Sequence, residues 1–276
     1  MSVSQEWRQT VTPTSLFSAF LAVASAVLVK LFRAACILVV LVAVWWFAVT
    51  IFQPPGYLLP GPSAVWSSIV GQWPYLSFHT SITLLEMVLG LAAGAVLGMG
   101  TASLMALYRP ARAALYPVLV ASQALPVFAI APLLVIWLGF GLASKIAMAT
   151  LIIYFPVASA FHDGLRRTDP MLLDLARLHR ASRWQTFRLI QLPAALPALG
   201  SGLRVAAAIA PIGAVVGEWV GASAGIGFVM LQANARMQTD TVFASLVLLG
   251  LSAVALRLTT DVLTRRLTPW VREQHL

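Results

Sequence analysis

The sequence predicts an all-α polytopic membrane protein, a bundle of about six transmembrane helices, on three observations. Of its 276 residues, 60% are hydrophobic and only 10% are charged, whereas a soluble domain carries about 25% charged residues. Several apolar runs also reach the roughly 20 residues that a helix needs to cross the hydrocarbon core. Finally, no segment alternates with period two, as the strands of a membrane β-barrel would.

Six apolar segments are long enough to be predicted as spans. They are residues 34–52, 84–107, 115–138, 144–161, 198–220 and 243–258, the last extendable to residue 263. An earlier run, residues 16–29, is short for a span, so we expect residues 1–33 to form a cytoplasmic or interfacial segment. A seventh span in that run stays open.

The basic residues predict an orientation for these spans. With six spans, all of the 18 Lys and Arg residues except Lys145 and Arg236 fall on one side of the membrane. The positive-inside rule makes that side cytoplasmic and places both termini inside a bacterial plasma (inner) membrane. The excess of 18 basic over 9 acidic residues is thereby explained without nucleic acid. Residues 264–276 form a basic cytoplasmic tail, and residues 53–83 form the largest outside loop.

The cytoplasmic segment 162–197 is too polar and too long to be a simple connector. Asp169-Pro170 predicts a helix start, with Pro170 in the first turn where its missing N–H has no cost. Apolar residues then recur at helical spacing, and Ser182 is a good N-cap for a second short helix. We expect that helix to stop at Leu192-Pro193. The pair is either a surface hairpin packed on its own bundle or a docking element for another protein.

This segment resembles the EAA loop in the membrane subunits of binding-protein-dependent ABC importers. That loop reads E-A-A, three residues, Gly, nine residues, Ile, one residue, Leu-Pro. The resemblance implies the fold of a type I importer permease, with residues 34–263 as the permease domain and 162–197 as its coupling loop. It assigns the ATPase contact to Asp174, Leu175, Ala176, Arg180, Ala181, Ser182, Phe187, Ile190, Leu192 and Pro193.

Arg180 departs from the family pattern, which has Gly at this position. Glycine there permits a left-handed backbone turn between the two short helices. An arginine in that conformation costs roughly 1 kcal/mol or more. The residues alone do not decide whether the loop is reshaped, adapted to its own ATPase or weakened.

Neither Lys30 nor Lys145 lies in a phosphate-binding G-x-x-x-x-G-K-[ST] motif. The resemblance therefore implies a transporter subunit that is not itself an enzyme and holds no cofactor, with ATP bound by separate ATPase subunits. It also implies an extracytoplasmic substrate-binding protein, a homodimer and contact with membrane lipid.

Residues 59–66 and 123–141 are similar to the nitrate, sulfonate and taurine branch of the family. Residues 210–221 and 233–240 look most like permeases for thiamine-precursor pyrimidines. The expected substrate is such a pyrimidine, with an aliphatic sulfonate, taurine or nitrate as the alternative.

A carboxylate within a span is a functional hypothesis by default. We assign Glu218 to the substrate pathway together with Pro211 and Trp219, because five glycines in residues 213–227 permit irregular backbone around it. Glu86 is expected to reach the outer headgroups instead. Gly90, Gly94 and Gly98 predict close helix packing, and the histidines, at positions 79, 162, 179 and 275, are expected to be solvated surface residues.

A secondary transporter or channel is the alternative from another class, and a membrane scaffold without transport is a further one. The first would need intramembrane ion-coupling charges or an inverted repeat, and neither stands out in the sequence.

Overall fold

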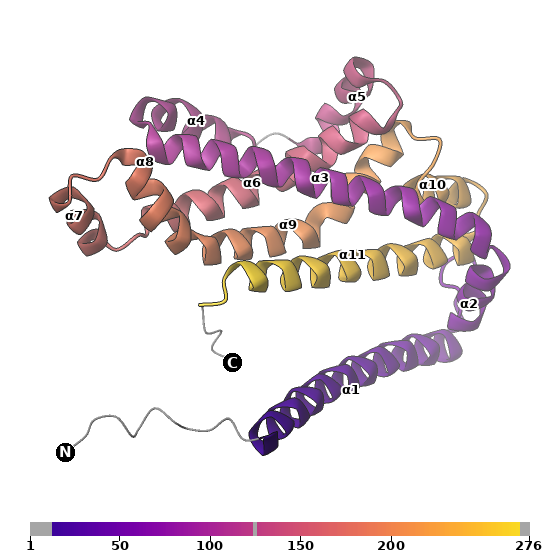
Figure 1. Ribbon diagram of the computed structural model, residues 1–276. Helices are drawn as coiled ribbons and strands as arrows, with labels where there is room; N and C mark the ends of the chain where they lie inside the picture. The colour runs from indigo at the N-terminus through magenta and orange to yellow at the C-terminus, as the bar shows by residue number, and fades with distance from the viewer. Residues whose placement is uncertain (1–12, 124–125, 271–276) are drawn as a thin grey trace. The chain divides into compact units, whose positions relative to one another are not determined.

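The computed structural model describes residues 13–123 and 126–270, which contain helices and no strand. The chain divides into two compact units, residues 1–64 and 65–276, and Figure 1 shows the helices of each. The elements are α1 (Pro13–Phe52), α2 (Pro62–Gly71), α3 (Trp73–Leu107), α4 (Arg109–Ala121), α5 (Val127–Leu138), α6 (Leu142–Arg166), α7 (Pro170–Leu178), α8 (Arg183–Thr186), the π-helical η1 (Phe187–Gln191), α9 (Leu192–Gly221), α10 (Ile226–Ala235) and α11 (Thr239–Leu267).

Five helical stretches of the described chain are long and apolar enough to cross a membrane. They are Ala35–Phe52 within α1, then α3, α6, the continuous run Arg183–Gly221, and α11. The predicted third span, residues 115–138, is broken into α4 and α5. Pro126 is the N-cap of α5 with extended backbone (φ −66°, ψ 113°), and proline lacks the N–H that would continue a helix through this point.

The first unit contains α1, which joins the predicted segments 16–29 and 34–52 into one helix of 40 residues. Its Trp45 indole donates a hydrogen bond of 3.1 Å to the carbonyl oxygen of Pro60. At 1.5 Å rise per residue, a helix of this length is about twice as long as the hydrocarbon core is thick.

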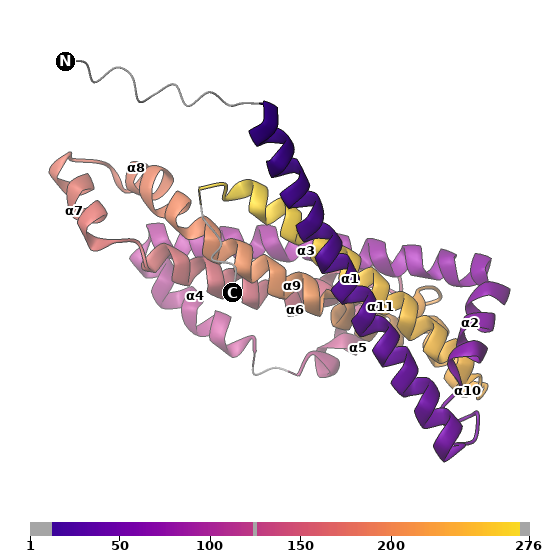
Figure 2. The ribbon, with the colours of Figure 1, turned by 90° about the horizontal axis from the view of Figure 1, so that it is seen from below.

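The second unit is built on α3, α6 and α9, which pack side by side (Figures 1 and 2). Small residues let these helices approach closely, as predicted for Gly90, Gly94 and Gly98. A Cβ at Gly94 would lie 2.6 Å from Ile153 Cγ2, and one at Gly98 would lie 3.0 Å from the backbone nitrogen of Ala158. The glycine face of α3 therefore packs directly on α6.

Two predicted boundaries were wrong. Residues 53–83 are not a long loop, because α2 and the first turns of α3 occupy most of them. The second short helix does not stop at Leu192-Pro193 but continues through η1 into α9. Leu192 donates its N–H to the Phe187 carbonyl, five residues back. This wider π turn accommodates Pro193, which has no N–H to donate.

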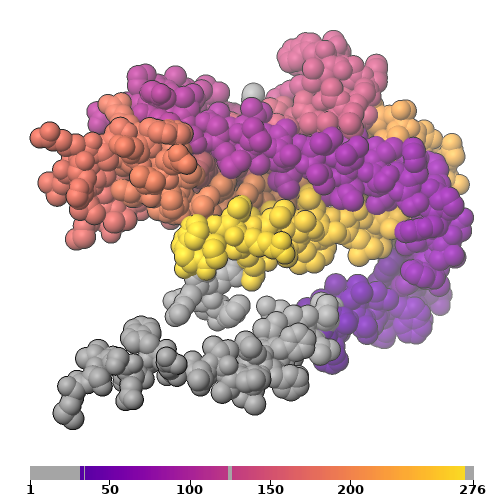
Figure 3. Space-filling view, in the orientation of Figure 1, coloured from indigo at the N-terminus to yellow at the C-terminus, as the bar shows by residue number. Residues whose placement is uncertain are grey.

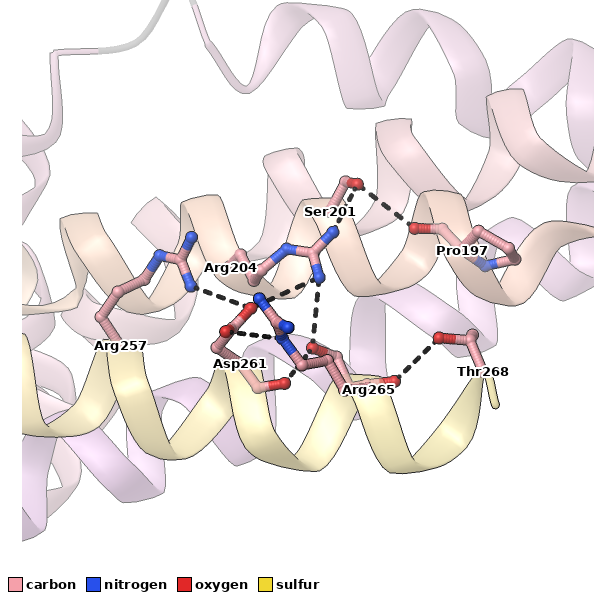
Figure 4. A network of polar contacts seen from close by, with 8 residues as sticks. Pro197, Ser201, Arg204, Arg257, Asp261, Arg265 and Thr268 are labelled. Carbon is pink, nitrogen blue, oxygen red and sulfur yellow. Dashed lines mark hydrogen bonds and ion pairs between the residues drawn. The ribbon is translucent and has the colours of Figure 1, made fainter. Parts of the chain in front are cut away.

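Helix α11 lies alongside α9 and α3, as the space-filling view in Figure 3 shows for α3. Its outer side chains are apolar and exposed, among them Leu251, Leu258 and Val262. At one end, Asp261 of α11 faces three arginines (Figure 4), of which Arg204 of α9 lies 3.6 Å away and Arg265 2.9 Å away. This network ties α9 to α11.

Candidate functional site

Helices α7 and α8 form a hairpin at the end of the bundle where α6 and α11 terminate in arginines (Figure 1). We call this the basic end. Both predicted helix starts are confirmed. The Asp169 side chain accepts a hydrogen bond of 2.8 Å from the Met171 N–H. Ser182 and Gln185 form a reciprocal capping box, which satisfies two otherwise unpaired N–H groups.

Arg180 adopts the left-handed conformation that the family's glycine would favour, with φ +53°. The Ala181 N–H donates to the Ala176 carbonyl and the Arg180 N–H to the Arg177 carbonyl, each at 2.9 Å. These two bonds define a Schellman turn that ends α7. The hairpin therefore keeps the glycine-type turn and is not rearranged around the arginine.

The predicted coupling residues divide between the two faces of the hairpin. Ala176 and Phe187 are buried against the rest of the bundle. Ala181, Ile190, Leu192 and Pro193 are half-buried, and Asp174, Arg180 and Ser182 are exposed.

The outward side of the hairpin is apolar and exposed. Met171 is 77% exposed and Leu178 is 81% exposed, and Leu175 and Trp184 are each about half exposed. The predicted amphipathic pattern is thus present, but its apolar residues mostly do not pack on the bundle. We name Met171, Leu172, Leu175, Leu178 and Trp184 the hairpin face. Exposed apolar patches of this kind mark interaction sites.

At the opposite end, the N-terminus of α10 is fastened by side chains from α3 and α9. Gly225 donates its N–H to His79 Nδ1 at 3.0 Å, and Ile226 donates to Thr83 Oγ1 at 2.7 Å. The Glu218 carboxylate accepts from the N–H groups of Gly227 and Phe228. It also accepts from the Thr83 hydroxyl at 2.6 Å.

We name His79, Thr83 and Glu218 the α10 clamp. The clamp supplies acceptors for the first N–H groups of a helix, which have no partner within the helix itself. Gly225 is required beside it, because it has φ +114° and a Cβ there would overlap the Glu218 carboxyl group. The clamp therefore fixes α10 against both α3 and α9.

Three expectations about polar residues were wrong. His79 is 5% exposed and His162 is 1% exposed, so neither is a solvated surface residue; His179 is exposed as expected, and His275 lies outside the described residues. Glu86 is fully buried and therefore does not reach the headgroups. Lys145 is also buried, and its ammonium donates to the Phe140 and Gly141 carbonyls.

A sequence signal for the α10 clamp did exist. The two clamp residues of α3, His79 and Thr83, have the i, i+4 spacing of one helical face. It was missed because the span was predicted to start at residue 84.

The predicted pathway residues are only partly brought together. Glu218 and Trp219 both line a cavity of about 390 Å³ between α9 and α10, whereas Pro211 is buried within α9 and does not line it. The expected irregular backbone is confined to the turn between α9 and α10. Gly213, Gly217 and Gly221 are helical.

The comparisons with known proteins agree with this architecture. Residues 90–273 match the family model for the binding-protein-dependent transport system inner membrane component. The chain belongs to this family. It is 48% identical over 238 residues to a probable ABC transporter permease protein of Haemophilus influenzae, covering 86% of this chain and 97% of that protein.

Two further relatives carry substrate names. The chain is 34% identical to the formylaminopyrimidine transport permease protein ThiX of Halalkalibacterium halodurans, covering 85% of this chain and 94% of that one. It is 32% identical to the taurine transport system permease protein TauC of Escherichia coli, covering 84% and 87%. The two identities are too similar to select a substrate.

Among solved structures, a chain of the MetNI methionine ABC transporter in inward-facing conformations aligns with a TM-score of 0.63. The alignment covers 72% of this chain and 98% of that chain at 22% identity. This likeness shows the fold, which confirms the predicted all-α bundle of the type I importer permease. The chain is thus the permease subunit of an ABC importer.

Proposed function

We propose that this permease forms half of the substrate pathway of an ATP-driven importer and receives movement from a separate ATPase through the hairpin face. The observation that carries this proposal is the exposure of that face. Its apolar side chains protrude beyond the bundle, although their caps and the Schellman turn hold the two helices in fixed conformations. A rigid, apolar and unpartnered surface is suited to bind a groove on another protein.

The link from the hairpin to the pathway is a continuous helix. Helix α8 passes through η1 into α9, so Arg183–Gly221 is one helical run. Movement of the hairpin on ATP binding would therefore reach the span directly. ATP would shift the population of inward- and outward-open states through its different affinity for the two.

The basic end is proposed to face the cytoplasm, since the arginines of α6, α7 and α11 gather there. A second copy of the chain is proposed to complete the pathway. The exposed apolar residues of α5, including Ile136 and Trp137, then contact the partner copy or lipid.

The proposed substrate is a small thiamine-precursor pyrimidine. The relative that transports a formylaminopyrimidine supports this choice, whereas the taurine relative supports the sulfonate alternative. The substrate-binding protein selects among such solutes before they reach the permease.

The test is co-purification of the tagged permease with an ATPase encoded beside it, followed by uptake in proteoliposomes containing the binding protein. We expect the ATPase to co-purify and uptake to require ATP. Uptake that proceeds without any ATPase would overturn the proposal. Point substitutions on the hairpin face are preferable to deleting residues 174–193, because such a deletion would also remove α8, η1 and the first two residues of α9.

A further inference from the structure

A cavity of about 310 Å³ lies at the basic end, between the hairpin and the corner where α3 gives way to α4. Figure 1 shows α4, α7 and α8 at this end of the bundle. Three arginines from three helices line the cavity, namely Arg109 of α4, Arg177 of α7 and Arg183 of α8. The rest of the lining is Ala106, Leu107, Leu173, Ala181, Thr186 and Gln191. Folding therefore brings the positive charge of α4 to those of the hairpin.

The cavity has no negative charge of its own to balance these arginines. Among the described residues that line it, none is acidic. Arg177 donates a hydrogen bond of 2.7 Å to Asp174, but their side chains are 78% and 65% exposed, and such surface ion pairs contribute little. A guanidinium also has five N–H donors, so Arg177 keeps donors for a further acceptor. Because arginine stays charged, the three groups repel one another unless an anion lies between them.

The chemistry of this lining suits a phosphate group. The planar guanidinium binds two phosphate oxygens at once, in hydrogen bonds that are strengthened by charge on both partners. Gln191 is half-buried in the lining, and its amide adds uncharged N–H donors. The volume of the cavity falls within the range of small-molecule sites. It can therefore hold a phosphate together with part of an ester substituent.

The surroundings of the cavity favour a lipid as the source of the phosphate. Leu107, which lines the cavity, is the last residue of α3, a helix long and apolar enough to cross a membrane. Leu104, one turn earlier, and Tyr108, the next residue, are both exposed. Tyrosine is enriched at the level of the headgroups, and basic pockets beside membrane spans bind anionic headgroups. A lipid can thus place its phosphate among the arginines and an acyl chain along α3.

The cavity and the hairpin face lie on different sides of α7. Leu173 and Arg177 line the cavity and are spaced i, i+4, whereas Met171, Leu175 and Leu178 of the hairpin face share another side at i, i+4, i+7. An anion in the cavity would leave the hairpin face uncovered. It would hold the opposite side of the hairpin against α4.

We propose that this cavity binds the phosphate of an anionic phospholipid headgroup, which joins the hairpin to the α3–α4 corner. The headgroup neutralises the repulsion between the arginine of α4 and those of the hairpin. This inference goes beyond the proposed function, since it requires neither an ATPase nor a transported solute.

The test uses the full-length permease, fluorescently labelled, in neutral detergent at constant ionic strength and without an ATPase. Binding is measured by thermophoresis in separate titrations with dihexanoyl-phosphatidylglycerol, with dihexanoyl-phosphatidylcholine and with inorganic phosphate. The cavity variant is Arg109→Gln/Arg183→Gln. The matched control is Arg112→Gln/Arg188→Gln, which removes two exposed arginines of α4 and η1 that do not line the cavity. Thermal unfolding checks that both variants fold.

We expect phosphatidylglycerol to bind at least about tenfold more tightly than phosphatidylcholine, which has the same chains but no net charge. It should also bind at least about tenfold more tightly than inorganic phosphate, because its acyl chains bury apolar surface. The cavity variant should weaken phosphatidylglycerol binding at least about tenfold and the control at most about twofold. If the cavity variant does not fold, Arg177→Gln at an exposed side chain gives the same comparison.

Four outcomes would overturn the inference. Equal binding of the two lipids would remove the role of the charge, and equal losses in the two variants would show attraction to the general surface charge only. Equal binding of inorganic phosphate would indicate a site for a free anion. Unchanged lipid binding by the cavity variant, with loss of ATPase co-purification, would assign the arginines to an acidic surface of the ATPase. Failure of the hairpin face to bind an ATPase would count against the proposed function alone.

Discussion

The two ends of the bundle differ in the kind of side chain that each buries or exposes. At the α10 clamp, polar groups are buried, and side chains of α3 and α9 satisfy the first N–H groups of α10. At the basic end, the hairpin face leaves apolar side chains in the open while the backbone around them is fully capped. Buried polar groups are retained when they are paired, and exposed apolar groups indicate a missing partner. The first end is thus fastened within the chain, and the second is the surface that we propose for docking of the ATPase.

The largest expected effect comes from breaking the α10 clamp. Glu218→Ala would leave the N–H groups of Gly227 and Phe228 without their acceptor, and each such loss costs about 1–3 kcal/mol. We expect the free energy of unfolding in detergent to fall by about 3 kcal/mol, and by less for Glu218→Gln, whose amide oxygen still accepts one bond. Asp174→Ala, an exposed carboxylate at the basic end, is the matched control. Equal stability of Glu218→Ala and this control would show that the clamp does not hold α10.

Substitution on the hairpin face should have the converse result. It should weaken association with the ATPase without lowering the stability of the permease. Leu178→Asp places a charge where we expect an apolar groove of the ATPase, and ATPase affinity should fall by about 2 kcal/mol, roughly 30-fold. Binding is measured by co-purification and by titration of labelled ATPase. Met237→Asp alters another exposed apolar residue, near the other end of the bundle, and this variant should bind the ATPase normally. If both variants bind alike, the hairpin face is not the docking surface.

The effect expected from breaking the Asp261 network is intermediate in size, because its groups are polar but only partly buried. Asp261→Asn would leave Arg204, Arg257 and Arg265 without this shared carboxylate. We expect a loss of about 1 kcal/mol in unfolding free energy. Added salt should restore part of it, because it screens the repulsion among the arginines. A loss that does not respond to salt would point to packing instead of charge.

The smallest expected effect comes from the turn and the cap that hold the hairpin rigid, and it tests that rigidity. Arg180→Gly removes the cost of a left-handed arginine and should stabilise the turn by up to about 1 kcal/mol. Ser182→Ala removes the N-cap of α8 and should destabilise it by about 1 kcal/mol. Hydrogen exchange of residues 176–186 should therefore slow in the first variant and quicken in the second. Changes of the same sign in both would contradict the assigned caps.

The residues that local rules govern were predictable. Ser182 and Asp169 cap helices because their short oxygen-bearing side chains reach nearby N–H groups. The resemblance assigned Arg180 to a position where the family's glycine permits a left-handed turn, and the structure shows that Arg180 adopts that conformation. Gly94 was predicted to pack closely because its four-residue spacing puts it on one helix face with Gly90 and Gly98.

The predictions that failed for His79 and Glu86 concern residues whose partners are distant in sequence. His79 was expected to be a loop residue, but it accepts a hydrogen bond from Gly225, which is 146 positions away in the sequence. Glu86 was expected to contact the headgroups, but it is buried in the folded bundle. Pro193 looked like a helix stop because local rules do not anticipate the π turn of η1.

By itself, the sequence determined that this protein is a helical membrane bundle, which end of it is basic, and where the α7–α8 hairpin begins and turns. These follow from length, apolarity and capping, which act over one or two helical turns. Only the tertiary structure decided which carboxylates are buried and that α10 is clamped by α3 and α9. Burial and pairing depend on which helices pack together, and that is a property of the whole bundle.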